Sequence, residues 1–233
     1  MILWSTDEKP ASEVIYISTM RMSVIILWFS LFPVPAWTGD AGLPSPRQEG
    51  GMPLLTALKQ RQSMRSFSDK PLSMQTISDL LWAGFGFNRE ELGMRTAPSS
   101  LNVQDITIYV FTPDGVWTYD APANRLLGVK EGDHRNLAGI QEFVWTAPLS
   151  LVYVSDFSLM KHGDREFTDE MKLTAASISA GHISQNVYLF CASEGLGAVA
   201  RASLNREAFV KEFGLSANQR IIFGQTIGYP IVE

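Results

Sequence analysis

Cysteine is almost absent from this sequence, because Cys191 is the only one among 233 residues. A disulfide within the chain is therefore impossible, and the fold must be stabilised by packing and hydrogen bonds. Cys191 follows Leu189 and Phe190 and is predicted to be a small buried hydrophobic residue. The scarcity of cysteine does not by itself distinguish an exported protein from a cytoplasmic one.

Histidine and clustered positive charge are also scarce. The three histidines, His134, His162 and His182, are scattered along the chain. Their spacing matches no zinc motif, so no metal is expected. The formal net charge is −5, and no run of five or more basic residues occurs. Both features argue against nucleic acid as a partner.

Long hydrophobic runs are limited to one N-terminal stretch. Residues 24–37 are apolar, follow a short basic start at Arg21, and contain Pro33 and Pro35. The stretch is shorter than the roughly 20 residues that a membrane helix needs, so no permanent membrane span is expected. It resembles a removable signal peptide. We therefore expect export, to the periplasm, with a cytoplasmic location as the alternative.

Composition divides the chain into three parts. Residues 1–41 form an upstream extension with the signal-like segment, which offers small residues for cleavage at Val34-Pro35-Ala36 and at Gly39-Asp40-Ala41. Residues 42–51, GLPSPRQEGG, are expected to be a linker. Residues 52–233 are expected to form one folded domain, because 45% of the chain is hydrophobic and such a chain can bury a core.

The folded part mixes helical and strand patterns. Helical signals occupy 54–61, 74–86, 136–144, 168–194 and 205–214. Strand signals occupy 106–112, 116–120, 149–157 and 220–229. The run 149–157 is nearly all apolar, so this strand is expected to be central and covered on both faces. The mixture, with a hairpin early in the domain, predicts the α+β class.

Two short polar segments carry side chains that could bind a ligand. The first, 61–67, reads RQSMRSF and holds two arginines, whose guanidinium groups present paired donors that match phosphate oxygens. The second, 97–104, reads APSSLNVQ and lies directly before a strand. Short polar groups at a strand edge can bind a heteroaromatic ligand. Each segment alone is equally compatible with a solvated loop or a turn.

Together the two segments resemble the FMN-dependent nitroreductase superfamily. The matching motifs are Arg-x-Ser-x-Arg-x-Phe, then Pro-Ser-Ser-x-Asn-x-Gln, and a Gly-Leu-Gly that follows a long helix. The phrases LLWAGFGFNR, RTAPSSLNVQ, DGVWTYD, ISQNVYLFCASEGLGAV and QTIGYP are similar to its branch of SagB-type dehydrogenases, relatives of thiazoline and oxazoline oxidases. The resemblance runs from about Gly51 to Pro230.

The resemblance implies a three-layer α+β fold with a mostly antiparallel central sheet, and a homodimer that binds FMN at its subunit interface. The residues that it places at the cofactor are Arg61, Gln62, Ser63 and Arg65 for the phosphate and ribityl chain; Pro98, Ser99, Ser100 and Asn102 along the flavin, partly from the second subunit; and Ala200, Arg201, Ala202 and Ser203 for backbone N–H groups near the ring.

The implied activity is ping-pong hydride transfer through flavin N5 to or from an organic small molecule. The flavin carries the chemistry and the protein tunes it, so no catalytic side chain is implied. NAD(P)H is the donor that the family implies, but it is a cytoplasmic metabolite, so export would require another reductant. Two alternatives are a cytoplasmic peptide thiazoline or oxazoline dehydrogenase and a flavin-binding protein without turnover.

Two departures from the family pattern concern the phosphate. Many members carry a second basic residue where this chain has Gln62, and many end in a Lys or Arg tail where this sequence ends in Ile231-Val232-Glu233. We therefore expect phosphate binding to depend mainly on Arg61 and Arg65.

Overall fold

The structure is a computed structural model that describes residues 39–161, 163 and 166–231. The signal-like segment 24–37, with the cleavage candidate at 34–36, lies outside the described residues. None of the described helices is both long enough and apolar enough to cross a membrane.

A seven-stranded sheet forms the middle layer, and every neighbouring pair of its strands is antiparallel. In spatial order the strands are β1 (Ala41–Gly42), β6 (Arg125–Glu131), β5 (Gly115–Asp120), β4 (Ile106–Thr112), β7 (Leu149–Asp156), β9 (Gln219–Gly228) and β8 (Gly197–Arg201). A separate ribbon pairs β2 (Phe87–Arg89) with β3 (Met94–Arg95). The four predicted strands are confirmed, as β4, β5, β7 and β9.

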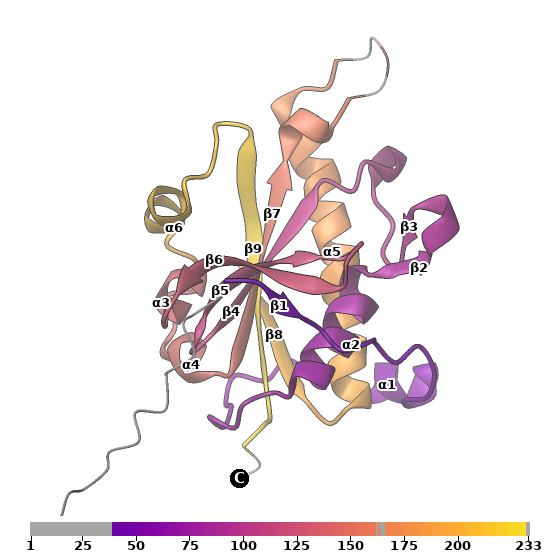
Figure 1. The fold of residues 1–233 in the computed structure, drawn as a ribbon, viewed down its shortest axis with the longest axis vertical. Helices are drawn as coiled ribbons and strands as arrows, with labels where there is room; N and C mark the ends of the chain where they lie inside the picture. Colours follow the sequence, from indigo (N-terminus) through magenta and orange to yellow (C-terminus); the bar gives the residue numbers. More distant parts are fainter. Residues whose placement is uncertain (1–38, 162, 164–165, 232–233) are drawn as a thin grey trace, which may run out of the picture. The chain divides into compact units, whose positions relative to one another are not determined.

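Helices cover both faces of the sheet and complete three layers (Figure 1). One face carries α1 (Leu54–Gln60), α2 (Met74–Phe85) and α5 (Asp169–Ser193). The other face carries α3 (Arg135–Ala138), α4 (Glu142–Thr146) and α6 (Arg206–Phe213). Single 3-10 turns occur at η1 (Glu90–Leu92), η2 (Ser100–Asn102) and η3 (Phe157–Leu159). This arrangement confirms the predicted α+β class.

Strand β7 separates two cores. Its residues from Leu149 to Ser155 are all buried, as its continuous apolar run predicts. Leu151 and Tyr153 pack in the cluster formed with α2 and α5, whereas Val152 and Val154 pack in the cluster formed with α3, α4 and α6. Alternate side chains of one strand therefore build the cores on opposite faces of the sheet.

The helix predicted across 136–144 is instead divided into α3 and α4. The carbonyl oxygen of Ala138 accepts a hydrogen bond from the Arg201 guanidinium, and so it is not used to continue the helix. Gly139 lies against the same group, because a Cβ at this position would be 2.6 Å from Nη1 of Arg201. This prediction was wrong because hydrophobic periodicity carries no information about a buried side chain from a distant strand.

The segment 39–52, here called the strap, was expected to consist mainly of a linker but is bonded to the domain. The Nε1 of Trp117 donates to the carbonyl oxygen of Gly39 at 2.9 Å, and the backbone N–H of Gly128 donates to Oδ1 of Asp40 at 3.0 Å. The next two residues form β1, which extends the sheet beside β6. The polar composition that predicted a linker over 42–51 could not show that the backbone groups of this segment find partners on the domain.

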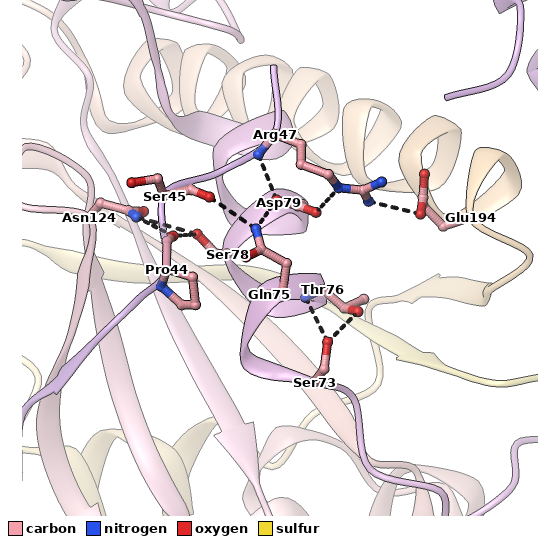
Figure 2. Close-up of polar contacts among 10 residues, drawn as sticks. All are labelled: Pro44, Ser45, Arg47, Ser73, Gln75, Thr76, Ser78, Asp79, Asn124 and Glu194. Carbon is pink, nitrogen blue, oxygen red and sulfur yellow. Dashed lines mark hydrogen bonds and ion pairs between the residues drawn. The ribbon is translucent and has the colours of Figure 1, made fainter. Parts of the chain in front are cut away.

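Asp79 of α2 is the main anchor of the strap (Figure 2). Its side chain is only 1% exposed, and it accepts from the backbone N–H and the Nε of Arg47 at 2.8 and 2.6 Å. The Nη2 of Arg47 continues to Glu194 at 3.0 Å, and Gln75 donates to both Asp79 and the carbonyl oxygen of Ser45. Burial raises the pKa of Asp79, but the hydrogen bonds from Arg47 and Gln75 outweigh it, so the pKa is lowered overall.

Replacing Arg47 with methionine leaves the buried carboxylate of Asp79 with Gln75 as its remaining side-chain donor. We expect the free energy of unfolding to fall by about 1–3 kcal/mol at pH 7, measured by urea unfolding. Because the pKa of Asp79 is lowered in the folded state, its contribution is present above the unfolded value of about 3.9 and is lost as the pH falls below it. The difference between the two proteins should therefore shrink at pH 3.

Arg89→Met is the matched control, because Arg89 is exposed and its guanidinium contacts the adjacent Asn88. This variant should retain the wild-type stability at both pH values. An Arg47→Met variant as stable as Arg89→Met at pH 7 would contradict the anchoring role, and an equal loss at both pH values would contradict the role of the carboxylate.

Candidate cofactor-binding site

The first predicted segment, Arg61–Phe67, lies along the outer edge of β8. Helix α1 ends at Gln60, and the chain then runs beside the last strand of the sheet. Ser63 forms a parallel bridge with Ala198, and the backbone N–H of Met64 donates to the carbonyl oxygen of Ala198 at 2.9 Å. An edge strand has unpaired backbone groups, and this segment satisfies part of them.

Gly197 allows this close approach. A Cβ at Gly197 would be 2.9 Å from Cβ of Met64 and 3.1 Å from the ring of Phe67, so a larger residue would displace the segment. Gly197 is the first residue of β8 and the second glycine of the Gly-Leu-Gly motif. The motif therefore has a structural role at the edge of the site.

The positive charges of Arg61 and Arg65 are not neutralised by any described carboxylate. No carboxylate lies within ion-pair distance of Arg61 or Arg65 among the residues that the structure describes. The guanidinium of Arg61 lies over the ring of Tyr188, 5.5 Å from its centroid. Gln62 and Ser63 are exposed beside them. Two unpaired guanidinium groups with adjacent amide and hydroxyl groups are a donor set that fits a phosphate.

The other end of β8 offers backbone donors. In the described part of the chain, the N–H groups of Ala202 and Ser203 make no hydrogen bond. The side chain of Arg201 is committed elsewhere: it is 8% exposed, and its Nε and Nη2 donate to Oγ1 of Thr226 at 3.1 and 2.8 Å. Burial lowers the pKa of Arg201 to about 10. The guanidinium of Arg201 is therefore not available to a ligand, and its backbone pairs with Gly224 of β9, which leaves Ala202 and Ser203 as the donors at this end.

The second predicted segment, 97–104, contains a constrained turn at 98–102. Leu101 and Asn102 have φ angles of 50° and 54°, and Gln104 has 51°, which is uncommon for residues other than glycine. Gln104 holds the turn, because its N–H donates to Oγ of Ser99 at 3.0 Å and its Oε1 accepts from Nε of Arg95 at 2.6 Å. Such backbone outliers cluster at functional sites.

A hollow of about 580 Å³ separates this turn from the first half of α5. Its lining combines the turn with one face of the helix: Pro98, Ser99, Ser100, Glu170, Met171, Thr174, Ala175, Ile178, Ser179 and His182. The volume is in the range of small-molecule pockets. Among the described residues, the buried Oγ of Ser179 has no hydrogen-bond partner. His182 is exposed on this wall.

Both predicted segments thus face α5, at different positions along the helix axis. The turn at 98–102 lies against residues up to His182, whereas Arg61 lies against Tyr188. Six residues of α-helix span roughly 9 Å at about 1.5 Å per residue. Tyr188 was not singled out by the sequence, because a tyrosine within a long helix carries no local signal of function.

The model of the Nitroreductase family matches residues 58–229, which include both segments and all of β8. This chain belongs to the nitroreductase family. It is therefore an oxidoreductase of the flavin type, as the resemblance of its motifs implied. The match covers the sheet from β4 to β9, the long helix and the Arg61–Phe67 segment.

Known relatives agree with this assignment. A protein of Methanocaldococcus jannaschii is 30% identical over 155 residues, which are 61% of this chain and 75% of that protein. A solved structure from Ralstonia eutropha JMP134 is 37% identical, covers 84% of this chain and 91% of its own, and has a TM-score of 0.77. Both carry provisional names as nitroreductases, so they support family and fold and leave the substrate open.

A more distant structure shows the same fold. The NADPH:FMN oxidoreductase of Vibrio harveyi, solved in complex with NAD+, is 23% identical, covers 77% of this chain and 69% of its own, and has a TM-score of 0.56. At this level of identity the likeness concerns the fold alone.

Proposed function

We propose that this member of the nitroreductase family is an FMN-dependent oxidoreductase for an organic small molecule. The observation that carries the proposal is the pair Arg61 and Arg65, which have no carboxylate partner among the described residues, beside an edge strand whose far end has N–H groups that make no hydrogen bond within the described chain. When bound, FMN would accept hydride from a donor and pass it to an acceptor, which is chemistry that protein side chains do not supply.

The residues of the chain would hold the two ends of the cofactor differently. Arg61, Ser63 and Arg65, with Gln62, would hold the phosphate by charge and hydrogen bonds. The N–H groups of Ala202 and Ser203 would donate toward the ring. Fixed donors of this kind stabilise negative charge that develops beside them, and they need no rearrangement to do so.

The hollow between the turn at 98–102 and α5 is the proposed space for the organic substrate. Its wall is mainly apolar, and its polar groups are hydroxyls of serine and threonine, the carboxylate of Glu170 and the imidazole of His182. Such a surface suits a flat organic molecule that is held by contact area and oriented by a few polar groups. NAD(P)H is the proposed donor for a protein that stays in the cytoplasm, in keeping with the name and bound nucleotide of the Vibrio harveyi structure, and an exported protein would use another reductant.

Arg61→Ala tests the phosphate site. Loss of a charge-assisted hydrogen bond costs about 1.5–3 kcal/mol, so the dissociation constant of FMN should rise roughly tenfold to a hundredfold. The measurement is a titration of the FMN fluorescence, with Lys211→Ala as a control that removes an exposed positive charge on α6, on the opposite face of the sheet from α5. Full FMN affinity in Arg61→Ala would overturn the assignment of the phosphate site.

We also propose that a second copy of the chain completes the site. Met171, Leu173 and Ile178 on α5 are large hydrophobic side chains that are 42%, 48% and 56% exposed. Met171 and Ile178 also line the hollow. Exposed apolar residues at a pocket mark an interaction surface, and a homodimer would cover the face of Met171 and Ile178 while each chain contributes its 98–102 turn.

Ile178→Asp tests the dimer. We expect the wild type to sediment with the mass of two chains and Ile178→Asp to shift toward the mass of one, because a buried unpaired carboxylate is costly. Val210→Asp is the control, since Val210 is 41% exposed on α6, across the sheet from α5. A wild type with the mass of one chain, or equal effects of both variants, would contradict this interface.

We also propose that the protein is exported, and the contacts of the strap limit where its signal peptide can be cleaved. Cleavage after Ala41 would remove Gly39 and Asp40, which bond to Trp117 and Gly128, and would shorten β1. Cleavage after Ala36 would keep the strap complete. The small residues at 34 and 36 suit a signal peptidase.

The N-terminus of the mature protein tests this choice. When the whole chain is produced in a Gram-negative bacterium, mass spectrometry of the periplasmic fraction should find a chain that starts at Trp37. A start at Gly42 would contradict the importance of the strap, and an uncleaved chain confined to the cytoplasm would contradict export.

A further inference from the structure

We propose that Tyr188 is a positioning residue that fixes the Arg61–Phe67 segment against β8 and so sets the affinity for the phosphate end of the cofactor. The inference rests on the proposed function. It concerns a residue of α5 that neither candidate motif contains.

The hydroxyl of Tyr188 joins two separate pieces of the site. The backbone N–H of Ala200, on β8, donates to Oη of Tyr188 at 2.6 Å. The same Oη lies 3.1 Å from Oγ of Ser63, in hydrogen-bond distance. Because the N–H of Ala200 belongs to the outer edge strand, the tyrosine occupies the position where a further strand would otherwise supply an acceptor.

The ring of Tyr188 adds a third contact. The guanidinium of Arg61 lies over it at 5.5 Å from the centroid, a distance at which a cation is attracted to an aromatic face. One side chain therefore restrains the hydroxyl of Ser63, the guanidinium of Arg61 and the backbone of β8 relative to one another. A site that is ordered before the ligand arrives loses less conformational entropy on binding.

The backbone of the segment is held at both ends, because Phe67 also forms a bridge with Pro230, but these backbone contacts do not fix the side chains of Arg61 and Ser63, which contact Tyr188. The segment bonds to β8 through the Ser63 bridge to Ala198 and the N–H of Met64. Ala202 and Ser203, by contrast, follow directly on the pairing of Arg201 with Gly224 of β9. The phosphate side of the site should consequently depend on Tyr188 more than the ring side does.

Comparison of FMN with riboflavin tests this asymmetry, because riboflavin lacks the phosphate. In Tyr188→Phe the ring remains over Arg61 and only the hydroxyl is lost. Removal of one neutral hydrogen-bonding group predicts a rise of about two- to tenfold in the dissociation constant of FMN. The dissociation constant of riboflavin should change by less than about twofold on the same scale, so the preference for FMN falls.

Tyr109→Phe is the matched control. Tyr109 lies on β4 and packs against Phe209 of α6, with 5.3 Å between ring centroids, on the face opposite α5. This variant should keep the wild-type affinity for both flavins. Hydrogen exchange gives a second readout, since the amide of Ala200 should exchange faster in Tyr188→Phe than in the wild type or in Tyr109→Phe.

The outcomes separate this inference from the proposed function. A selective loss of FMN affinity with faster exchange at Ala200 supports the positioning role. Equal weakening of FMN and riboflavin, or no change in either, overturns it while the flavin site stands. A wild-type protein that binds neither flavin overturns the proposed function and the inference with it.

Discussion

The outer edge of β8 is the constraint on which the site depends. β8 is the last strand in the sheet order, and an edge strand carries backbone groups that no neighbouring strand satisfies. The chain satisfies the first part through Met64 and the middle through the hydroxyl of Tyr188. Beyond them, the described chain leaves the N–H groups of Ala202 and Ser203 without a partner. The part of β8 and its extension that stays unpaired is thereby limited to a few N–H donors, which could otherwise promote aggregation.

Arginines near this edge differ in their environments, and the environment of each decides whether its guanidinium can bind a ligand. Arg201 is buried among neutral oxygens, which satisfy its guanidinium and leave it unavailable to a ligand. Arg61 and Arg65 remain near the surface with no carboxylate partner in the described part of the chain. Positive charge that is not neutralised within the protein attracts anions to the site. A phosphate at this edge would neutralise charge that the fold itself leaves unpaired.

The sequence predicted those features that depend on local pattern. The apolar run from Leu149 identified the buried strand β7, and the caps Ser73 and Asn205 marked the starts of α2 and α6. Features decided by distant partners were not predictable in this way. The break between α3 and α4 depends on Arg201, and the anchoring of the strap depends on Asp79, which is far along the chain.

In the candidate site, too, residues within a local motif were predictable and residues positioned by distant partners were not. The two polar segments were recognised from their motifs, and the structure places both against α5. Tyr188 carries no such motif, because its importance comes from the meeting of a helix, an edge strand and a loop. The missing information was three-dimensional in each case, since no spacing along one element reports which side chain from another element reaches it.

The most direct test of the central claim is the visible absorbance spectrum of the purified protein, followed by heat release and chromatographic identification of any flavin. We expect flavin bands and released FMN at about one per chain, in keeping with a bound redox cofactor. A colourless protein that also fails to take up added FMN would contradict it, because the unpaired arginines beside β8 would then not form a flavin phosphate site.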